Sequence, residues 1–214
     1  MGDHILFFYG TLMAPQILHR VIHGSPTPQK WQKDLLHFRP AILHGYRRHR
    51  VRNADYPGII AAEESPSSSS NSISTSTGTG TGTGARSASV LGTVVSGLTD
   101  GDLHRLDIFE GSEYAREKVR VRILREALSD HGPEAGGPDG NMHVDGDKGA
   151  DQDRHLKDVL EAAGAEFADE GEEVEAETYV WISGRGMLED AEWDFEAFKR
   201  DKMAWWVAAD ERDW

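Results

Sequence analysis

The sequence predicts an α+β domain with a curled or barrel-like sheet. Predicted strands outnumber predicted helices, and the elements do not alternate in the regular βαβ order that builds a parallel sheet. At 214 residues with 38% hydrophobic side chains, the chain is long enough to bury one sizeable core. We therefore expect a single domain over residues 1–214 that is interrupted by long loops.

The first block of predicted structure covers residues 5–62. Its elements are, in chain order, a buried strand at Ile5–Tyr9, a helix at Pro15–Ile22, a strand with a basic face at Ala41–Arg52, and a turn at Tyr56–Gly58 that leads into Ile59–Ala61. The first strand is predicted from a continuous apolar and aromatic run that ends at Gly10. The helix is predicted with Pro15 in its first turn and Gly24 after its end.

The second and third blocks cover residues 90–127 and 178–214. Their elements are a strand at Val90–Leu98, a helix at Asp100–Phe109, a half-exposed strand at Val119–Ile123, a strand at Thr178–Ile182, and a terminal helix at Asp190–Ala209. Thr99 or Asp100 suits the N-cap of the first of these helices. In the strand that follows, apolar residues alternate with basic ones, as expected when one face is buried.

Two segments between the blocks are predicted to be disordered insertions. Residues 65–89 are almost entirely Ser, Thr and Gly, so they cannot bury enough apolar surface to offset the entropy of the chain. Residues 129–177 are acidic, rich in Gly and Asp, and broken by two prolines. Because the cost of closing a loop grows slowly with its length, one domain can accommodate both insertions.

The net charge of −14 comes mainly from one segment. Ser129–Thr178 holds sixteen of the 37 acidic residues and three of the 23 basic ones, a balance of −13. The remaining residues include 21 acidic and 20 basic ones, so the rest of the chain is nearly neutral. The acidity therefore describes the second insertion and not the whole domain.

The composition also bears on compartment and metal binding. The chain has no cysteine, which excludes disulfides and thiolate metal sites and fits a reducing compartment. No apolar run approaches membrane-spanning length, and the N-terminus has neither a basic leader nor a small-residue cleavage site. The ten histidines form no spaced cluster of metal-site type. We expect a cytoplasmic protein without a membrane span or a metal site.

One carboxylate stands out at the end of the predicted helix at 100–109. Glu110 follows Leu103 by seven residues and Leu106 by four, so its side chain projects onto the apolar face. It also lies in the last turn, where the helix dipole disfavours a negative charge. Burial and the dipole both raise the pKa of a carboxyl group toward that of a usable proton acceptor. The structural alternative is a frayed helix end at which Glu110 pairs with Arg105 or Arg116.

A second candidate site is the turn Tyr9-Gly10-Thr11-Leu12 at the end of the first strand. Its glycine allows a ligand to approach the backbone, and consecutive N–H groups can hold a carboxylate or another anionic oxygen. The same four residues also suit a plain turn that ends a strand.

Three motifs in this order resemble the γ-glutamylcyclotransferase-like superfamily. They are YGTL after an N-terminal apolar strand, Tyr56-Pro57-Gly58 after a basic strand, and LDIFEGSEYAR from Leu106 to Arg116. The resemblance covers all three blocks and omits both insertions. It is strongest for the branch that holds γ-glutamylamine cyclotransferases and the plant proteins induced by avirulence genes.

The resemblance implies a fold, a reaction and a site. The family fold is a small mixed β-barrel flanked by helices. Its enzymes release 5-oxoproline and an amine from a γ-glutamyl amine or peptide by intramolecular acyl transfer, with neither metal nor cofactor. The YGTL-type loop holds the glutamyl end, which assigns substrate binding to Tyr9, Gly10, Thr11 and Leu12. The glutamate of the FEG-type segment is the general acid/base, and that position is Glu110.

Neighbouring side chains have competing interpretations. Tyr56 and Tyr114 are candidates for substrate binding, as pocket walls or hydrogen-bond donors, although aromatics at strand entrances also serve as core residues. Glu113, which follows the helix-ending Gly111, is interpreted as a solvated residue or an ion-pair partner. Arg116 is either a partner of Glu110 or a surface arginine on a strand.

Two other classes of function stay open. Residues 46–52 (YRRHRVR) offer a basic stripe for nucleic-acid phosphates, although a strand divides them between two faces. A non-catalytic interaction protein would keep the fold and bind protein partners through the acidic insertion. Trp205-Trp206 in the terminal helix is interpreted as core cover, with a partner surface as the alternative. Our expectation is a small-molecule γ-glutamyl substrate and no nucleic-acid partner.

Overall fold

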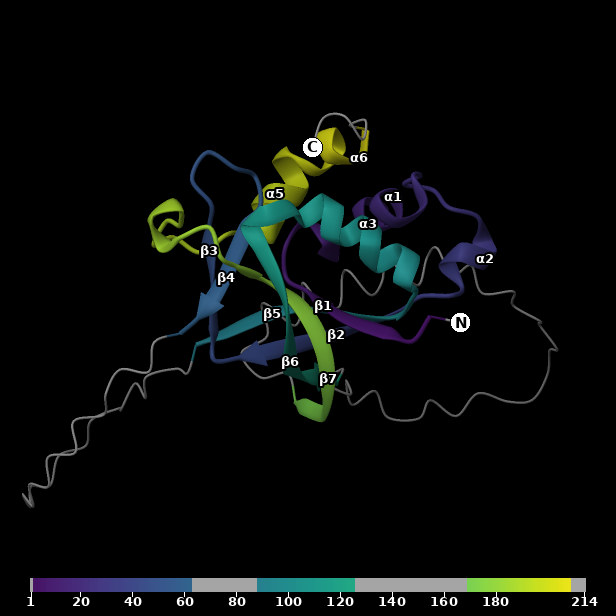
Figure 1. The fold of residues 1–214 in the computed structure, drawn as a ribbon, viewed down its shortest axis with the longest axis horizontal. Helices are drawn as coiled ribbons and strands as arrows, with labels where there is room; N and C mark the ends of the chain where they lie inside the picture. The colour runs from purple at the N-terminus through teal and green to yellow at the C-terminus, as the bar shows by residue number, and fades with distance from the viewer. Residues whose placement is uncertain (1, 63–87, 126–168, 209–214) are drawn as a thin grey trace, which may run out of the picture.

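The chain forms a closed five-stranded barrel, shown in Figure 1 by a computed structural model that describes residues 2–62, 88–125 and 169–208. The barrel strands are, in spatial order, β1 (His4–Phe8), β5 (Ser89–Leu98), β2 (His37–His44), β6 (Tyr114–Leu124) and β7 (Glu170–Trp181). β1 closes the barrel by pairing in parallel with β7, and the other neighbouring strands pair antiparallel. The predicted α+β fold with a small mixed barrel is confirmed.

Helices and a small second sheet surround the barrel. The second sheet pairs β3 (Tyr46–Arg50) with β4 (Pro57–Ala61). The helices are α1 (Pro15–His23), α2 (Lys30–Lys33), α3 (Asp100–Glu110), α5 (Phe195–Asp201) and α6 (Met203–Ala208), with short 3-10 turns at Thr11–Met13, Gly111–Glu113 and Arg185–Met187. In Figure 1, α1, α3, α5 and α6 lie together on one side of the barrel. Among the described segments, none of the helices is long and apolar enough to cross a membrane.

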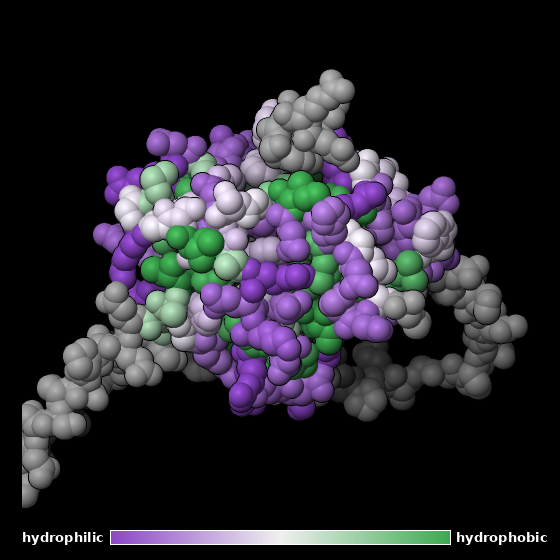
Figure 2. Space-filling view, in the orientation of Figure 1, coloured by the Kyte–Doolittle hydropathy of each residue, from purple (hydrophilic) through white to green (hydrophobic). Residues whose placement is uncertain are grey.

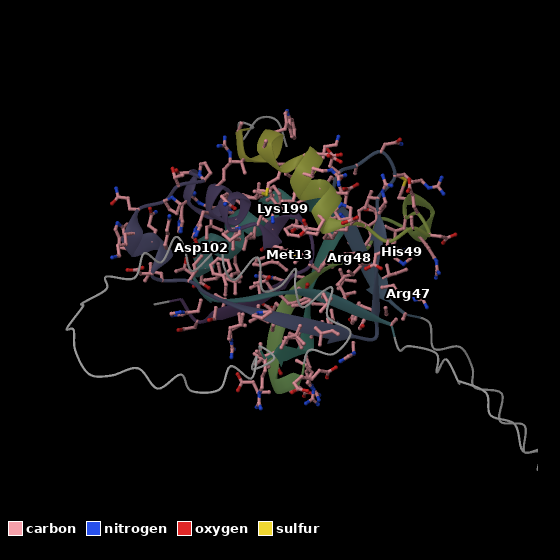
Figure 3. All side chains as sticks on the ribbon, turned by 180° about the vertical axis from the view of Figure 1, so that it is seen from behind. Met13, Arg47, Arg48, His49, Asp102 and Lys199 are labelled. Atoms are coloured by element: carbon pink, nitrogen blue, oxygen red, sulfur yellow. The ribbon has the colours of Figure 1, made fainter. Side chains whose placement is uncertain are left out.

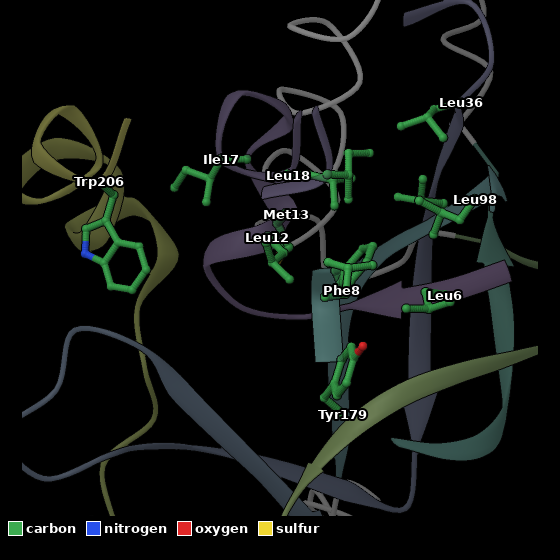
Figure 4. Close-up of a cluster of buried hydrophobic side chains, with 14 of the residues drawn as sticks. Leu6, Phe8, Leu12, Met13, Ile17, Leu18, Leu36, Leu98, Tyr179 and Trp206 are labelled. Carbon is green, nitrogen blue, oxygen red and sulfur yellow. The ribbon is translucent and has the colours of Figure 1, made fainter. Parts of the chain in front are cut away.

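β1 is apolar from Ile5 to Phe8 because both faces of this part of the strand are covered. Side chains alternate between the two faces of a strand. Leu6 and Phe8 point toward the helices and belong to the same buried cluster as residues of α1 and α6, which Figure 4 draws. Phe7 and Tyr9 point the other way and pack with residues such as Val94 inside the barrel. This two-sided burial accounts for the continuous run from which the strand was predicted. It also delivers the end of β1 to the junction between barrel and helices.

The prediction of one strand over Ala41–Arg52 is wrong. The chain turns at Gly45, whose φ of +80° lies in the left-handed region that favours glycine. Residues before the turn belong to β2, which pairs with β5 and β6, and residues after it belong to β3, which pairs with β4. The basic run at 46–50 is therefore part of the second sheet.

β7 begins at Glu170, so the predicted boundaries of the acidic insertion are wrong at its end. Residues 170–177 pair with the basic strand β6, where Lys118 lies 3.7 Å from Glu175 and Arg122 lies 3.3 Å from Glu173. Opposite charges on neighbouring strands stabilise a pairing that apolar content alone did not indicate. Figure 2 shows largely hydrophilic surface over β6 and β7. The predicted insertion residues 65–87 and 129–168 lie outside the described residues.

The predicted terminal helix is two short helices and starts later than expected. The Asp194 carboxylate accepts hydrogen bonds from the N–H groups of Glu196 (2.8 Å) and Ala197 (3.1 Å), which makes it the N-cap of α5. The preceding segment lies beside β3 instead, because the Arg50 N–H donates to the Ala191 carbonyl at 3.1 Å. Lys202, with φ of −125°, separates α5 from α6.

α3 begins with a capping box that contains the predicted cap Thr99. The Asp102 N–H donates to Thr99 Oγ1 at 3.2 Å, and the Thr99 N–H donates to Asp102 Oδ2 at 2.8 Å. We expect Thr99→Ala to lower the free energy of unfolding by about 1 kcal/mol, since the first-turn N–H groups lose their acceptor. Urea denaturation would measure this loss. Thr99→Ser keeps the hydroxyl, and an equal loss in both variants would contradict the role of the cap.

Candidate active site

A cavity of 280 Å³ lies where the ends of β1, β7 and α3 meet α6 and the start of β4. Its walls are mostly aromatic, and the described residues that line it include two carboxyl groups. The lining residues are Phe7, Phe8, Tyr9, Gly10, Thr11, Leu12, Tyr56, Pro57, Phe109, Glu110, Glu113, Tyr114, Tyr179 and Trp206. All seven residues singled out from the sequence for catalysis or substrate binding are in this set. Segments that lie far apart in the chain thus converge on one cavity.

Glu110 is the last residue of α3 and its carboxyl group faces this cavity. Burial, and then the negative charge of Asp107, raise the pKa of Glu110 from 4.5 to about 8. The direction agrees with the sequence prediction, and loss of hydration is the main cause. A carboxyl group with this pKa exchanges protons readily near neutral pH.

The two arginines considered as partners of Glu110 bind elsewhere. Arg105 Nη1 donates to the Ile22 carbonyl at 3.1 Å. Arg116 lies 3.6 Å from Asp107 and 3.8 Å from Glu177. The alternative in which Glu110 is neutralised by either arginine is therefore wrong. Asp107, in contrast, is held by Arg116 and by the hydroxyl of Tyr179, which donates to it at 2.8 Å.

The loop Tyr9–Leu12 also lines the cavity. The Gly10 carbonyl accepts from the Met13 N–H at 3.0 Å, which closes a 3-10 turn over Thr11–Met13. The first N–H groups of such a turn have no partner within it. Gly10 also passes close to Pro57, because a Cβ at this position would lie 2.8 Å from Pro57 Cγ. Glycine at this position therefore lets the loop approach β4.

The predicted tyrosines form walls, and their hydroxyl protons are already donated. The Tyr114 hydroxyl donates to the Pro57 carbonyl at 2.8 Å, and the Tyr56 hydroxyl donates to Glu113 Oε2 at 2.9 Å. The two rings meet edge to face, with centroids 6.4 Å apart. Burial, and then Glu113, raise the pKa of Tyr56 to about 12, and burial raises the pKa of Tyr114 strongly. Both side chains are neutral at physiological pH.

Tyr9 has the same character deeper in the site. Its hydroxyl donates to the Tyr179 carbonyl at 2.7 Å, which ties the loop to β7. Burial, and then the charge of Glu110, raise the pKa of Tyr9 well above its usual value. The Tyr9 side chain therefore anchors the loop to β7.

Several residues of the cavity were missed or misread in the sequence. Glu113 lines the cavity and binds Tyr56, whereas it was expected to be solvated or ion-paired. Trp206, drawn in Figure 4, is buried, and its ring centroid lies 6.5 Å from that of Tyr56. Its neighbour Trp205 is 54% exposed. Tyr179 enters because β7 lies beside β1. No local signal places Tyr179 here, since its position depends on a pairing between distant strands.

The basic residues of β3 do not form one surface stripe. The Arg48 side chain is only 12% exposed, and the buried His49 bonds through Nδ1 with the Glu189 carbonyl at 2.8 Å. Arg47, labelled in Figure 3, is exposed. Arg50 Nε lies 3.8 Å from Glu189 Oε2. Exposed and nearly buried residues are therefore mixed along this run, and its basic groups do not share one solvent-facing surface. Within the described ranges, no group of three or more His, Asp or Glu residues is arranged to hold a metal ion.

Comparisons with known proteins agree with the sequence motifs. The family model "Gamma-glutamyl cyclotransferase, AIG2-like" matches residues 6–71. Protein AIG2 C of Arabidopsis thaliana is 22% identical over 197 residues, which cover 92% of this chain and 73% of that protein. Protein AIG2 A of the same plant is 27% identical over 165 residues, 75% of this chain and 77% of that protein. A solution structure from Arabidopsis thaliana aligns with a TM-score of 0.46 at 22% identity, covering 96% of this chain and 78% of that one.

Proposed function

Because the chain belongs to the γ-glutamylcyclotransferase-like superfamily, in its AIG2-like branch, we propose that it releases 5-oxoproline and a free amine from a γ-glutamyl amine or peptide. One observation carries the proposal. Glu110, with its pKa raised to about 8, lines the same cavity as the Tyr9–Leu12 loop. This combination offers a proton acceptor next to a place for an anionic substrate group.

The chemistry needs one group that accepts and returns a proton. The α-ammonium of the substrate gives a proton to Glu110, and the free amine then attacks the γ-carbonyl carbon. A new C–N bond closes the five-membered lactam, and the original amide C–N bond breaks as Glu110 returns the proton to the departing nitrogen. The ring nitrogen gives up its second proton to the released amine, which leaves as an ammonium ion, and Glu110 is again a carboxylate. Nucleophile and electrophile belong to the same molecule, so the site accelerates the reaction mainly by holding the substrate in a folded, near-attack conformer.

The cavity offers complementary contacts for each part of such a substrate. The first backbone N–H groups of the loop, from Gly10 to Leu12, suit the α-carboxylate. The ionised Glu110 suits the α-ammonium, and rings such as those of Tyr114 and Trp206 cover the methylene chain and keep water away from it. The departing amine then faces the side of the cavity that contains Tyr56 and Glu113. The same backbone donors offer an alternative role as stabilisers of the tetrahedral oxyanion.

A panel assay tests the proposal. The full-length protein would be incubated with γ-glutamyl amines and γ-glutamyl dipeptides, and 5-oxoproline and released amine would be measured together. We expect the two products in equal amounts from at least one member of the panel, and none from the matching α-glutamyl isomers. Failure to form 5-oxoproline across the whole panel would reject the proposal and leave a non-catalytic role on this fold.

A further inference from the structure

A nearly buried arginine contacts the Tyr9–Leu12 loop. Arg48 comes from β3 and its side chain is 12% exposed (Figure 3). Its Nη1 donates to the carbonyl of Tyr9 at 3.0 Å and lies 3.5 Å from the carbonyl of Leu91. Arg48 does not itself line the cavity. A guanidinium group that is taken out of water to bind a backbone carbonyl calls for a functional or structural reason.

The position of the guanidinium is fixed by two further contacts. Nη2 of Arg48 lies 3.1 Å from Oε1 of Glu192, and the guanidinium carbon lies 5.7 Å from the ring centroid of Trp193. Trp193 is buried, and its Nε1 donates to the Asp55 carbonyl at 2.8 Å. The segment that carries these partners is itself bound to β3 through the Ala191 carbonyl. The donor that meets Tyr9 is thus part of a rigid support.

This contact determines which way one peptide plane faces. In a trans peptide the C=O of one residue and the N–H of the next point in opposite directions, and no peptide bond in the described ranges is cis. Because the Tyr9 carbonyl accepts from Arg48, the N–H of Gly10 points the opposite way, away from Arg48. Gly10 is one of the residues that line the cavity, and Arg48 is not. The contact with Arg48 therefore fixes the direction of a backbone donor in the cavity lining.

We infer that Arg48 is a positioning residue which holds the Tyr9–Gly10 peptide so that the Gly10 N–H binds the α-carboxylate of the substrate. The inference rests on the proposed function for the identity of the substrate and adds a residue that the motifs did not indicate. Arg48 touches neither substrate nor reacting atoms. Replacement of Arg48 should therefore slow the reaction only of substrates whose α-carboxylate binds the Gly10 N–H.

A pair of substrates separates this role from general structural support. A γ-glutamyl amide and the matching 4-aminobutyryl amide share the amine nucleophile and the scissile amide, and only the first carries the α-carboxylate. We expect Arg48→Met to lower kcat/KM for the γ-glutamyl amide by about 10- to 100-fold, the range of a lost hydrogen bond to a charged group. For the 4-aminobutyryl amide, which yields 2-pyrrolidinone, we expect a change of less than about threefold.

Two control variants test the specificity of the effect: one changes a neighbouring arginine on β3, and the other keeps a positive charge at position 48. Arg47→Met removes the exposed neighbouring arginine and is expected to leave both substrates unaffected. Arg48→Lys keeps a charge but cannot bind the Tyr9 carbonyl and Glu192 through one planar fork, so it should show a smaller loss of the same selective kind. It also carries the test if Arg48→Met does not fold. Equal losses for both substrates in the folded variants would overturn the inference.

A second measurement does not depend on turnover. The amide resonance of Gly10 in the 15N-labelled protein is expected to shift when 5-oxoproline is added and to stay unchanged with 2-pyrrolidinone, which lacks the carboxylate. In Arg48→Lys the shift should shrink. A Gly10 resonance that ignores 5-oxoproline, or responds equally in the variant, rejects the role of Arg48. Missing turnover in the unmodified protein, by contrast, rejects the proposed reaction, and the resonance then decides the inference on its own.

Discussion

Replacement of Glu110 by glutamine is expected to lower kcat by about 10²- to 10⁴-fold, the usual contribution of a general acid–base group. Glutamine has nearly the same size and fills the same place at the end of α3, but it accepts no proton at neutral pH. Substrate binding through the Tyr9–Leu12 loop should persist, so KM is expected to change far less than kcat. Release of 5-oxoproline under saturating and limiting substrate would give both constants.

Glu113→Gln is the matched control for this experiment. Both glutamates line the cavity, and they lie three residues apart. Glu113 accepts a hydrogen bond from Tyr56, which a glutamine oxygen also accepts, so this variant should retain kcat within about tenfold, well short of the loss of an acid–base group. Unchanged turnover in Glu110→Gln, or a larger loss in Glu113→Gln, would move the acid–base role away from Glu110.

The sequence identified the centre of the site because local rules are broken there. A carboxylate on the apolar face of a helix, at the end where the dipole opposes it, is costly unless it has a task, and Glu110 does lie desolvated in a cavity. Tyr9–Leu12 was found for a similar reason, since a buried strand that runs into a glycine turn exposes backbone at a defined place. Both signals are local in the chain. They needed no knowledge of tertiary structure.

The remaining walls depend on contacts between distant segments. Tyr179 reaches the cavity only because β7 closes the barrel against β1, and Trp206 only because α6 folds back over α3. The start of β7 does not stand out in the sequence because its residues are mostly Glu and Gly, a composition typical of disordered segments. Those acidic side chains pair with the basic side chains of β6. The charges that stabilise β7 therefore belong to another strand and are not visible in the sequence of β7 alone. Arg48 was missed likewise, because its role depends on which way β3 faces.

Glu110 should also make the stability of the protein depend on pH. Its pKa rises from 4.5 to about 8 on folding, so between these values the folded protein binds a proton that the unfolded chain has released. Stability from this group is complete below pH 4.5 and is lost as pH rises through 8. Each pKa unit is worth about 1.4 kcal/mol, and partial exposure of the residue reduces the total, so we expect a loss of about 2–3 kcal/mol. Urea denaturation at pH 5 and at pH 9 would measure this. The free energy of unfolding of Glu110→Gln, relative to that of the unmodified protein, should rise by this amount between the two pH values.

The ionisation that weakens the fold is the one that the reaction requires. Glu110 must be deprotonated to accept the α-ammonium proton, so kcat/KM is expected to rise with pH toward about 8 over the interval in which stability falls. Asp107→Asn removes the second cause of the raised pKa while it keeps an acceptor for Tyr179. Both the activity profile and the stability difference should therefore move to lower pH together in this variant. A shift in one without the other would mean that the group controlling the rate is not the carboxyl group that is buried at the end of α3.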